Sequence, residues 1–226
     1  MPTSLRREYD AALLELDTLL ARMGNAAGAA IDNALTALRT HDLELARSVI
    51  ARDSEIDAAE HEIEHRCLTL FLRQQPVAGD LRKVSTALKM VTDIERIADQ
   101  ASDIAEIVTC LSGVCGHNTH IDQMAQATIK MVTNSLDAFV RRDLTLAWSV
   151  IEYDDVVDRL FDECKSDLIA EIAQNPEDGE RVLDVLMIAK YLERIGDHAT
   201  NIAEWVEFSI TGSHKSAMHG AEAAAR

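Results

Sequence analysis

Two short acidic stretches contain the residue types and spacing that could do chemistry in this chain. The stretch YLERIGDHATNIAEW at 191–205 places oxygen-bearing side chains four residues apart, and DIERIADQASDIAEI at 93–107 repeats the arrangement. Carboxylate and amide oxygens are the ligands that hard cations such as Mg²⁺, Mn²⁺ or iron prefer. The residue types therefore predict two metal-binding ladders. Their members are Glu95, Asp99 and Asp103 in the first ladder and Glu193, Asp197 and Asn201 in the second.

A spacing of four residues puts the side chains of each ladder on one stripe of a helix. A solvated helix face is the simpler explanation of a single acidic stripe. However, like charges four residues apart repel by about 0.2–0.5 kcal/mol per pair, so a purely structural helix gains nothing from stacking them. Because the chain carries the stripe twice, a functional role is favoured.

One stripe cannot complete the coordination shell of a metal ion, so a second helix must supply further ligands. The stretch RDSEIDAAEHEIEH at 52–65 is rich in acidic residues and is the best source. The candidates in it are Asp53, Asp57, Glu60 and Glu64.

Motifs of known enzyme classes are missing from the sequence. Di-iron carboxylate bundles need Glu-x-x-His on two helices. The chain has one match, Glu62 with His65, whose repeat equivalents are Glu163 and Ser166. The sequence also has no phosphate-cradling Gly-rich loop, no Gly-x-Ser-x-Gly and no His-Glu-x-x-His. We therefore predict a non-enzymatic protein without catalytic residues.

The ladders need long helices to position them, and the composition favours such helices. The 226 residues include only 9 Gly, 3 Pro and 4% aromatic residues. Asp42 and Asp143 are candidate helix N-caps, and Pro76 and Pro176 disfavour helical geometry in the residue before them. We expect no sheet. The expected helical segments are about Thr3–Leu38, Leu43–Gln75, Asp80–Cys110, His120–Val140, Leu144–Gln174 and Gly179–Ile210.

An internal repeat organises these six helices. RTHDLELARSVIARDSEID at 39–57 matches VRRDLTLAWSVIEYDDVVD at 140–158, and the two ladders match in the same order. Apolar residues in each ladder helix follow steps of four and three, which is typical of helices packed side by side. We predict an all-α fold of two tandem three-helix bundles at 1–112 and 118–212, followed by a disordered tail at 213–226.

Charge and hydropathy exclude several classes of partner. A net charge of −17 argues against nucleic acid and against anionic membrane surfaces. No window of about 18 apolar residues occurs, so we expect no membrane-spanning segment. The four cysteines form no Cys-x-x-Cys pair, which is typical of reduced thiols. These features predict a cytoplasmic protein.

Beyond these patterns, the sequence resembles the PhoU family, whose members regulate bacterial phosphate transport. The resemblance rests on QPVAGDLRKV at 75–84, on IERIADQASDI at 94–104 and on LERIGDHATNIAEW at 192–205. Together with the internal repeat, the similarity covers about residues 5–212.

The resemblance implies a cytoplasmic, homodimeric adaptor. Such a protein restrains a sensor histidine kinase and modulates the phosphate ABC transporter through its ATPase subunit while phosphate is plentiful. Some PhoU-like proteins bind metal clusters through an acidic signature, which corresponds here to the six ladder positions. Two departures concern this signature: Ala98 stands where the second ladder has Gly196, and Asn201 replaces an acid.

Two other hypotheses remain open at this point. A metal-binding carboxylate bundle with storage or hydrolytic activity predicts oxidation of ferrous iron or turnover of a phosphoester. A purely structural helical scaffold predicts no phosphate-linked phenotype when the protein is deleted.

Overall fold

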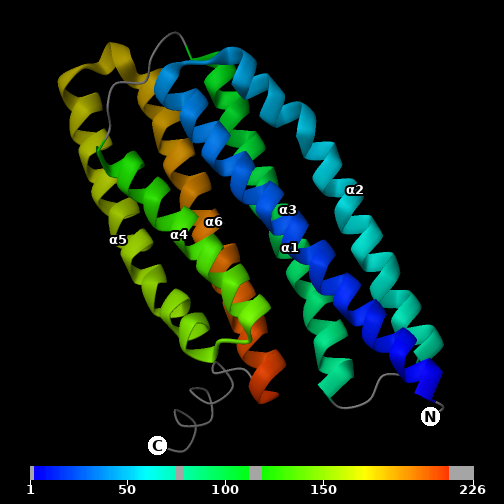
Figure 1. Ribbon diagram of the computed structural model, residues 1–226. Helices are drawn as coiled ribbons and strands as arrows, with labels where there is room; N and C mark the ends of the chain where they lie inside the picture. The colour runs from blue at the N-terminus through cyan, green and yellow to red at the C-terminus, as the bar shows by residue number, and fades with distance from the viewer. Residues whose placement is uncertain (1–2, 75–78, 112–118, 214–226) are drawn as a thin grey trace, which may run out of the picture.

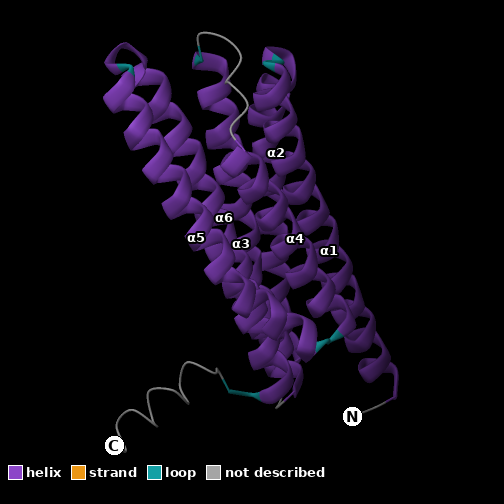
Figure 2. Cartoon of the chain, turned by 90° about the vertical axis from the view of Figure 1, so that its left-hand side faces the viewer, coloured by secondary structure: helices purple, strands orange, loops and turns teal. Residues whose placement is uncertain are grey.

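Long helices make up nearly all of the described structure (Figure 1). The structure, a computed structural model, describes residues 3–74, 79–111 and 119–213. Within these ranges no strand occurs (Figure 2), so the all-α prediction is confirmed. A short 3₁₀ helix, η1, spans Pro176–Asp178. The six α-helices are α1 (Thr3–Thr40), α2 (Leu43–Gln74), α3 (Gly79–Cys110), α4 (Thr119–Arg141), α5 (Leu144–Gln174) and α6 (Gly179–Thr211).

The helices form two three-helix bundles that lie side by side (Figure 1). Helices α1, α2 and α3 contact one another, as do α4, α5 and α6. Between the bundles, α3 packs against α6 and α1 contacts α4. Buried side chains of both bundles join in one apolar core. The two helices that carry the acidic ladders therefore lie at the centre of the molecule.

The same turn opens α2 and α5. Asp42 and Asp143 each accept a hydrogen bond at 3.0 Å from the backbone amide three residues later. These bonds satisfy an amide that the first helical turn leaves unpaired, which confirms both predicted N-caps. The preceding residues, His41 and Arg142, both have left-handed backbone conformations, with φ of 53° and 52°. The internal repeat is thus visible at the level of single backbone angles.

The helix ends lie within about two residues of those expected from the sequence. Pro176 begins η1 with one residue between it and the end of α5, which agrees with the effect of a proline on the residue before it. Pro76, the linker between the bundles and nearly all of the predicted tail lie outside the described residues, so the division at 112–118 stays a prediction. No described helix has a stretch that is long and apolar enough to cross a membrane.

Candidate metal centres

The first ladder meets the acidic face of α2 in the N-terminal bundle. Asp53 and Asp57 of α2 and Asp99 of α3 each offer one carboxylate oxygen, and these oxygens all lie within 4.8 Å of one another. Three carboxylates at this separation can share one hard cation. The structure thus brings Asp99 together with two of the acidic residues suggested for the second helix. We call Asp53, Asp57 and Asp99 the first centre.

Burial and mutual repulsion raise pKa values around the first centre. Burial, followed by the charge of Asp99, raises the pKa of Asp53 to about 6. The same two causes raise the pKa of Glu95 to about 7. Both effects disfavour the ionised carboxylate, because it loses water and gains a like-charged neighbour. A bound cation would offset both effects, so the cluster favours positive charge.

Glu60 and Asp103 extend the acidic cluster along the α2–α3 contact. Burial is the main cause that raises the pKa of Glu60. Burial and then Glu106 raise the pKa of Asp103, whereas Arg194 of α6 lowers it. Asp103 also adds to the repulsion on Asp53. The third member of the first ladder therefore lies near the first centre and near α6 at once.

The second ladder lies near acidic residues of α5, although their oxygens do not all approach within 4.8 Å as those of the first centre do. Burial, followed by Asp158 and Asp197, raises the pKa of Asp154 to about 6. Burial, followed by Glu193, raises the pKa of Asp197. The carboxylates of α5 and α6 thus repel one another as those of α2 and α3 do. We call Asp154, Asp158 and Asp197 the second centre.

Sequence reasoning did not single out Asp154 or Asp158 as ligands. The signal that identifies them is the internal repeat, because Asp57 aligns with Asp158 and Asp53 aligns with Asp154 at the same offset. Copying the α2 candidates onto α5 through this alignment finds both. Glu60 aligns instead with a phenylalanine at position 161, so the second cluster lacks that carboxylate.

Asn201 lies at the border between the two bundles. Its Nδ2 donates a hydrogen bond of 3.2 Å to Oδ1 of Asp93 on α3, and Nδ1 of His198 lies 3.0 Å from the same oxygen. These contacts join α6 to α3. Because Asn201 stands where the first ladder has Asp103, the second cluster lacks this carboxylate as well.

A basic side chain flanks each ladder. Nη1 of Arg96 lies 3.2 Å from Oδ2 of Asp99, and Nζ of Lys190 lies 2.6 Å from Oε1 of Glu193. Both basic side chains are about half exposed. Solvent screens such pairs, so each contributes little stability. They compete only weakly with a cation for the carboxylates.

A β-carbon at the position of Gly196 would fit beside the second centre, where the first ladder has Ala98. Ala98 and Gly196 are both buried. A Cβ atom built on Gly196 would lie 3.4 Å from Cγ1 of Val157 and 3.7 Å from Oδ1 of Asp154. These are ordinary van der Waals distances, so either residue fits beside the acidic cluster.

Known proteins share both the sequence pattern and the fold. The family model of the PhoU domain matches residues 20–108 and 121–206. The phosphate-specific transport system accessory protein PhoU homolog of Clostridium acetobutylicum is 37% identical, over 92% of this chain and 96% of its own length. The homolog of the same name from Pseudomonas aeruginosa is 36% identical, over 92% of this chain and 88% of its own length.

Solved structures agree with these matches. The crystal structure of PhoU from Pseudomonas aeruginosa has a TM-score of 0.88 and 35% identity, covering 91% of this chain and 100% of that chain. The crystal structure of the phosphate transport system regulatory protein PhoU from Streptococcus pneumoniae has a TM-score of 0.86 and 27% identity. The match covers 91% of this chain and 98% of that chain. The family model matches one range in each three-helix bundle and together these ranges cover well over half of the sequence. The chain therefore belongs to the PhoU family.

Proposed function

We propose that this protein is a non-enzymatic regulator of phosphate uptake and phosphate-starvation signalling. Its relatives are named accessory proteins of the phosphate-specific transport system, which supports a role beside a transporter rather than in a catalytic reaction. It acts in the cytoplasm as a homodimeric adaptor with two partners, a sensor histidine kinase and the ATPase subunit of the phosphate ABC transporter. It restrains the kinase and modulates the transporter while phosphate is plentiful.

The first carboxylate centre is the observation that carries this proposal. In the first centre, the oxygens of Asp53, Asp57 and Asp99 lie within 4.8 Å of one another, as a shared hard cation requires. We propose that Mg²⁺, Mn²⁺ or iron binds there and, more weakly, in the second centre, which has fewer carboxylates. The centres then meet basic partner residues directly or through the bound cation.

Regulation without a catalytic step requires unequal binding to two states of a partner. An adaptor that binds the restrained state of the kinase more tightly shifts the kinase toward that state by the difference in binding free energy. Couplings of about 1–3 kcal/mol change such equilibria by about 5–150-fold. The acidic ladders on one shared core would supply charge complementarity for this selection.

Charge reversal at the ladders tests the adaptor role. We expect loss of capture of both the kinase and the ATPase, because four lysines replace the acidic contacts. The measurement is a pull-down of each purified partner by the tag-free chain immobilised through an antibody. Capture equal to that of the parent would refute the proposal that the partners bind at the acidic ladders. The substitutions are Glu95→Lys, Asp99→Lys, Glu193→Lys and Asp197→Lys.

A matched control changes the net charge by the same amount at exposed positions away from the ladders. This control variant should retain capture, because its substitutions leave both centres intact. If it loses capture as well, overall charge rather than the ladders determines binding. Its substitutions are Glu44→Lys, Asp162→Lys, Glu177→Lys and Glu180→Lys.

Elemental analysis of the dialysed, tag-free protein tests the metal centres. We expect near-stoichiometric metal in the parent and its loss when Asp53, Asp57 and Asp99 are changed together to Asn, which keeps their shape and removes their charge. The same changes at the second centre should remove a smaller amount. If the parent contains no metal, the metal proposal is wrong, and the carboxylates would contact partner residues directly, without a cation.

A metal-binding bundle with storage or hydrolytic activity is the second candidate function. The close approach of three carboxylates in the first centre favours it, because such clusters also occur in metal-dependent enzymes. Metal-loaded protein that oxidises ferrous iron or turns over a phosphoester would support this candidate, whereas the adaptor predicts neither activity.

A further inference from the structure

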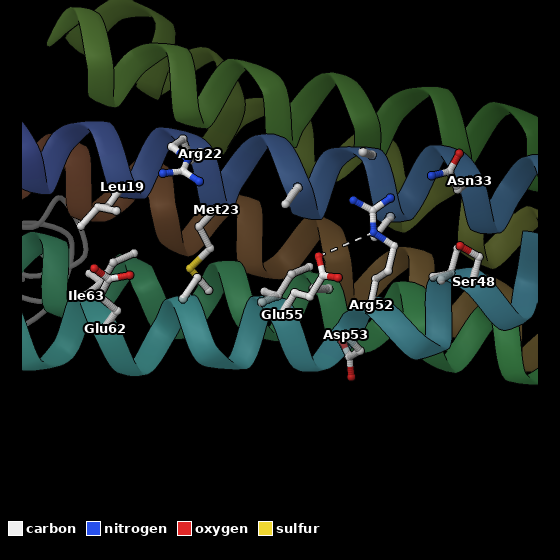
Figure 3. A pocket seen from close by; sticks show the side chains of 17 residues that line it. Leu19, Arg22, Met23, Asn33, Ser48, Arg52, Asp53, Glu55, Glu62 and Ile63 are labelled. Atoms are coloured by element: carbon white, nitrogen blue, oxygen red, sulfur yellow. Dashed lines mark ion pairs between the residues drawn. The ribbon is translucent and has the colours of Figure 1, made fainter.

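An apolar groove runs between α1 and α2 (Figure 3) and reaches Ala98 of α3 and Asp53 of the first centre. Its volume is about 300 Å³, at the lower end of the range for small-molecule sites. Along α1 it extends from Leu19 to Asn33, which corresponds to about 21 Å of helix. The groove is therefore long and narrow. Its apolar lining includes Met23, Ala26, Ala30, Ile56, Ala59 and Ile63.

The internal repeat shows that this groove is specific to the first bundle. The repeat offset aligns α1 with α4, where Met23 matches Met124 and Asn33 matches Asn134. At the same offset, Ala30 aligns with Met131, which is fully buried. The second bundle thus places a long side chain where the first has a methyl group.

A second pair of positions shows the same difference between the bundles. Ala59 of α2 aligns with Leu160 of α5, which packs against the apolar core. Small side chains on both walls therefore open space that the equivalent side chains occupy in the other bundle. The groove follows from these substitutions rather than from the three-helix fold itself.

The rim of the groove carries charges of both signs, Arg22 and Arg52 beside Asp53, Glu55 and Glu62. Glu55 pairs with Arg52, and Oε1 of Glu62 lies 2.8 Å from Nη2 of Arg66, so Arg22 is the cation that remains available in the groove. Arg22 and Arg52 lie on opposite walls, and the repeat places uncharged residues, Gln123 and Tyr153, at the equivalent positions. Figure 3 shows Arg52 reaching from α2 toward α1, with its ion pair to Glu55 at 3.7 Å. Arg22 forms no ion pair with any residue in the described part of the chain, although acidic residues outnumber basic ones by 39 to 22.

We propose that this groove binds a single-chain amphiphile with an anionic head, of the fatty-acid type. The narrow apolar channel takes the hydrocarbon chain, and Arg22 takes the carboxylate, since a guanidinium presents several donors to one anion. Asp53 of the first centre lies at the edge of the groove, and its carboxylate points away from the α1 wall (Figure 3), so the amphiphile would bind beside the first centre rather than in it. The inference does not depend on the proposed regulatory function.

Calorimetric titration of the full chain with octanoate, decanoate and dodecanoate, each below its micelle concentration, tests the proposal. We expect one saturable site whose affinity rises roughly tenfold for every two methylene groups, because each buried methylene adds a similar transfer free energy. Absence of saturable binding, or affinity independent of chain length, would overturn the proposal.

Two variants fill the groove with the side chains that the second bundle has at the equivalent positions. Ala30→Met and Ala59→Leu should each weaken dodecanoate binding at least tenfold while circular dichroism and the melting temperature show a folded protein. Two variants are used because either alone could disturb packing. Dodecanoate binding that is unchanged in both folded variants would show that the chain binds elsewhere.

The head group is tested by comparing two arginines. Arg22→Gln should weaken dodecanoate binding severalfold and leave binding of uncharged dodecanol unchanged, whereas Arg47→Gln, outside the groove, should change neither. Equal loss for both ligands would contradict the role of Arg22. If no amphiphile binds but Ala30→Met changes the oligomeric state in light scattering, a second copy of the chain fills the groove and the proposal is wrong.

Discussion

At the scale of single residues, the centres collect carboxylates that oppose their own ionisation. Asp53, Glu95 and Asp154 are partly buried beside other acids, and their pKa values rise to about 6, 7 and 6. A helix that served only to fold would gain more from uncharged side chains at these positions. The retained charge is therefore better explained by binding than by stability.

These pKa values predict how the stability of the metal-free protein depends on pH. The unfolded values of Asp and Glu lie near 4, so between about pH 4 and pH 7 the folded chain binds more protons than the unfolded chain. The free energy of unfolding must then fall as pH rises through this window. We expect the melting temperature in the presence of a chelator to decline from pH 5 to pH 7.5.

Two comparisons identify the origin of this decline. The double variant Asp53→Asn, Glu95→Gln should show a smaller decline, because neither replacement ionises. Asp162→Asn, at an exposed position, should decline like the parent. Added Mn²⁺ should raise the melting temperature of the parent at pH 7.5 more than that of the double variant. An equal decline in the parent and the double variant would assign the pH dependence to other groups.

At the scale of the elements, helix limits were predictable because local chemistry determines them. Asp42 and Asp143 cap their helices through bonds to amides only three residues away, and Pro176 acts on its immediate neighbour. Such signals do not depend on what packs against the helix. The acidic stripe of α3 was predictable for the same reason, since spacing alone puts Glu95 and Asp99 on one face.

Contacts between elements were only partly predictable. The α2 candidates included Asp53 and Asp57, but choosing them from the acidic residues around them required the relative position of α2 and α3. The hydrogen bond of Asn201 to Asp93 depends on the packing of α6 against α3, which no spacing within one helix reveals. The groove between α1 and α2 depends on volume differences between aligned residues, such as Ala30 and Met131.

At the scale of the whole molecule, the two bundles depend on each other. Helix α3 contacts α6 about as extensively as it contacts α2 within its own bundle. One apolar core includes buried residues of all six helices. Separating the bundles would expose much of the buried surface of α3 and α6, and burial of such surface is the main favourable contribution to folding. We therefore expect the bundles, although they are repeats in sequence, to be stable only together.

The shared core has a consequence for the chain when it is cut. The molecule resembles a dimer whose two subunits are covalently linked. We therefore expect the two halves to assemble even when the covalent link between them is missing. We expect fragments 1–111 and 119–226 to aggregate when expressed separately and to assemble into a soluble one-to-one complex when expressed together. Size-exclusion chromatography with light scattering measures this. Stable, monomeric fragments that do not bind each other would show that each half folds by itself. The contact between α3 and α6 would then join two independently folded domains.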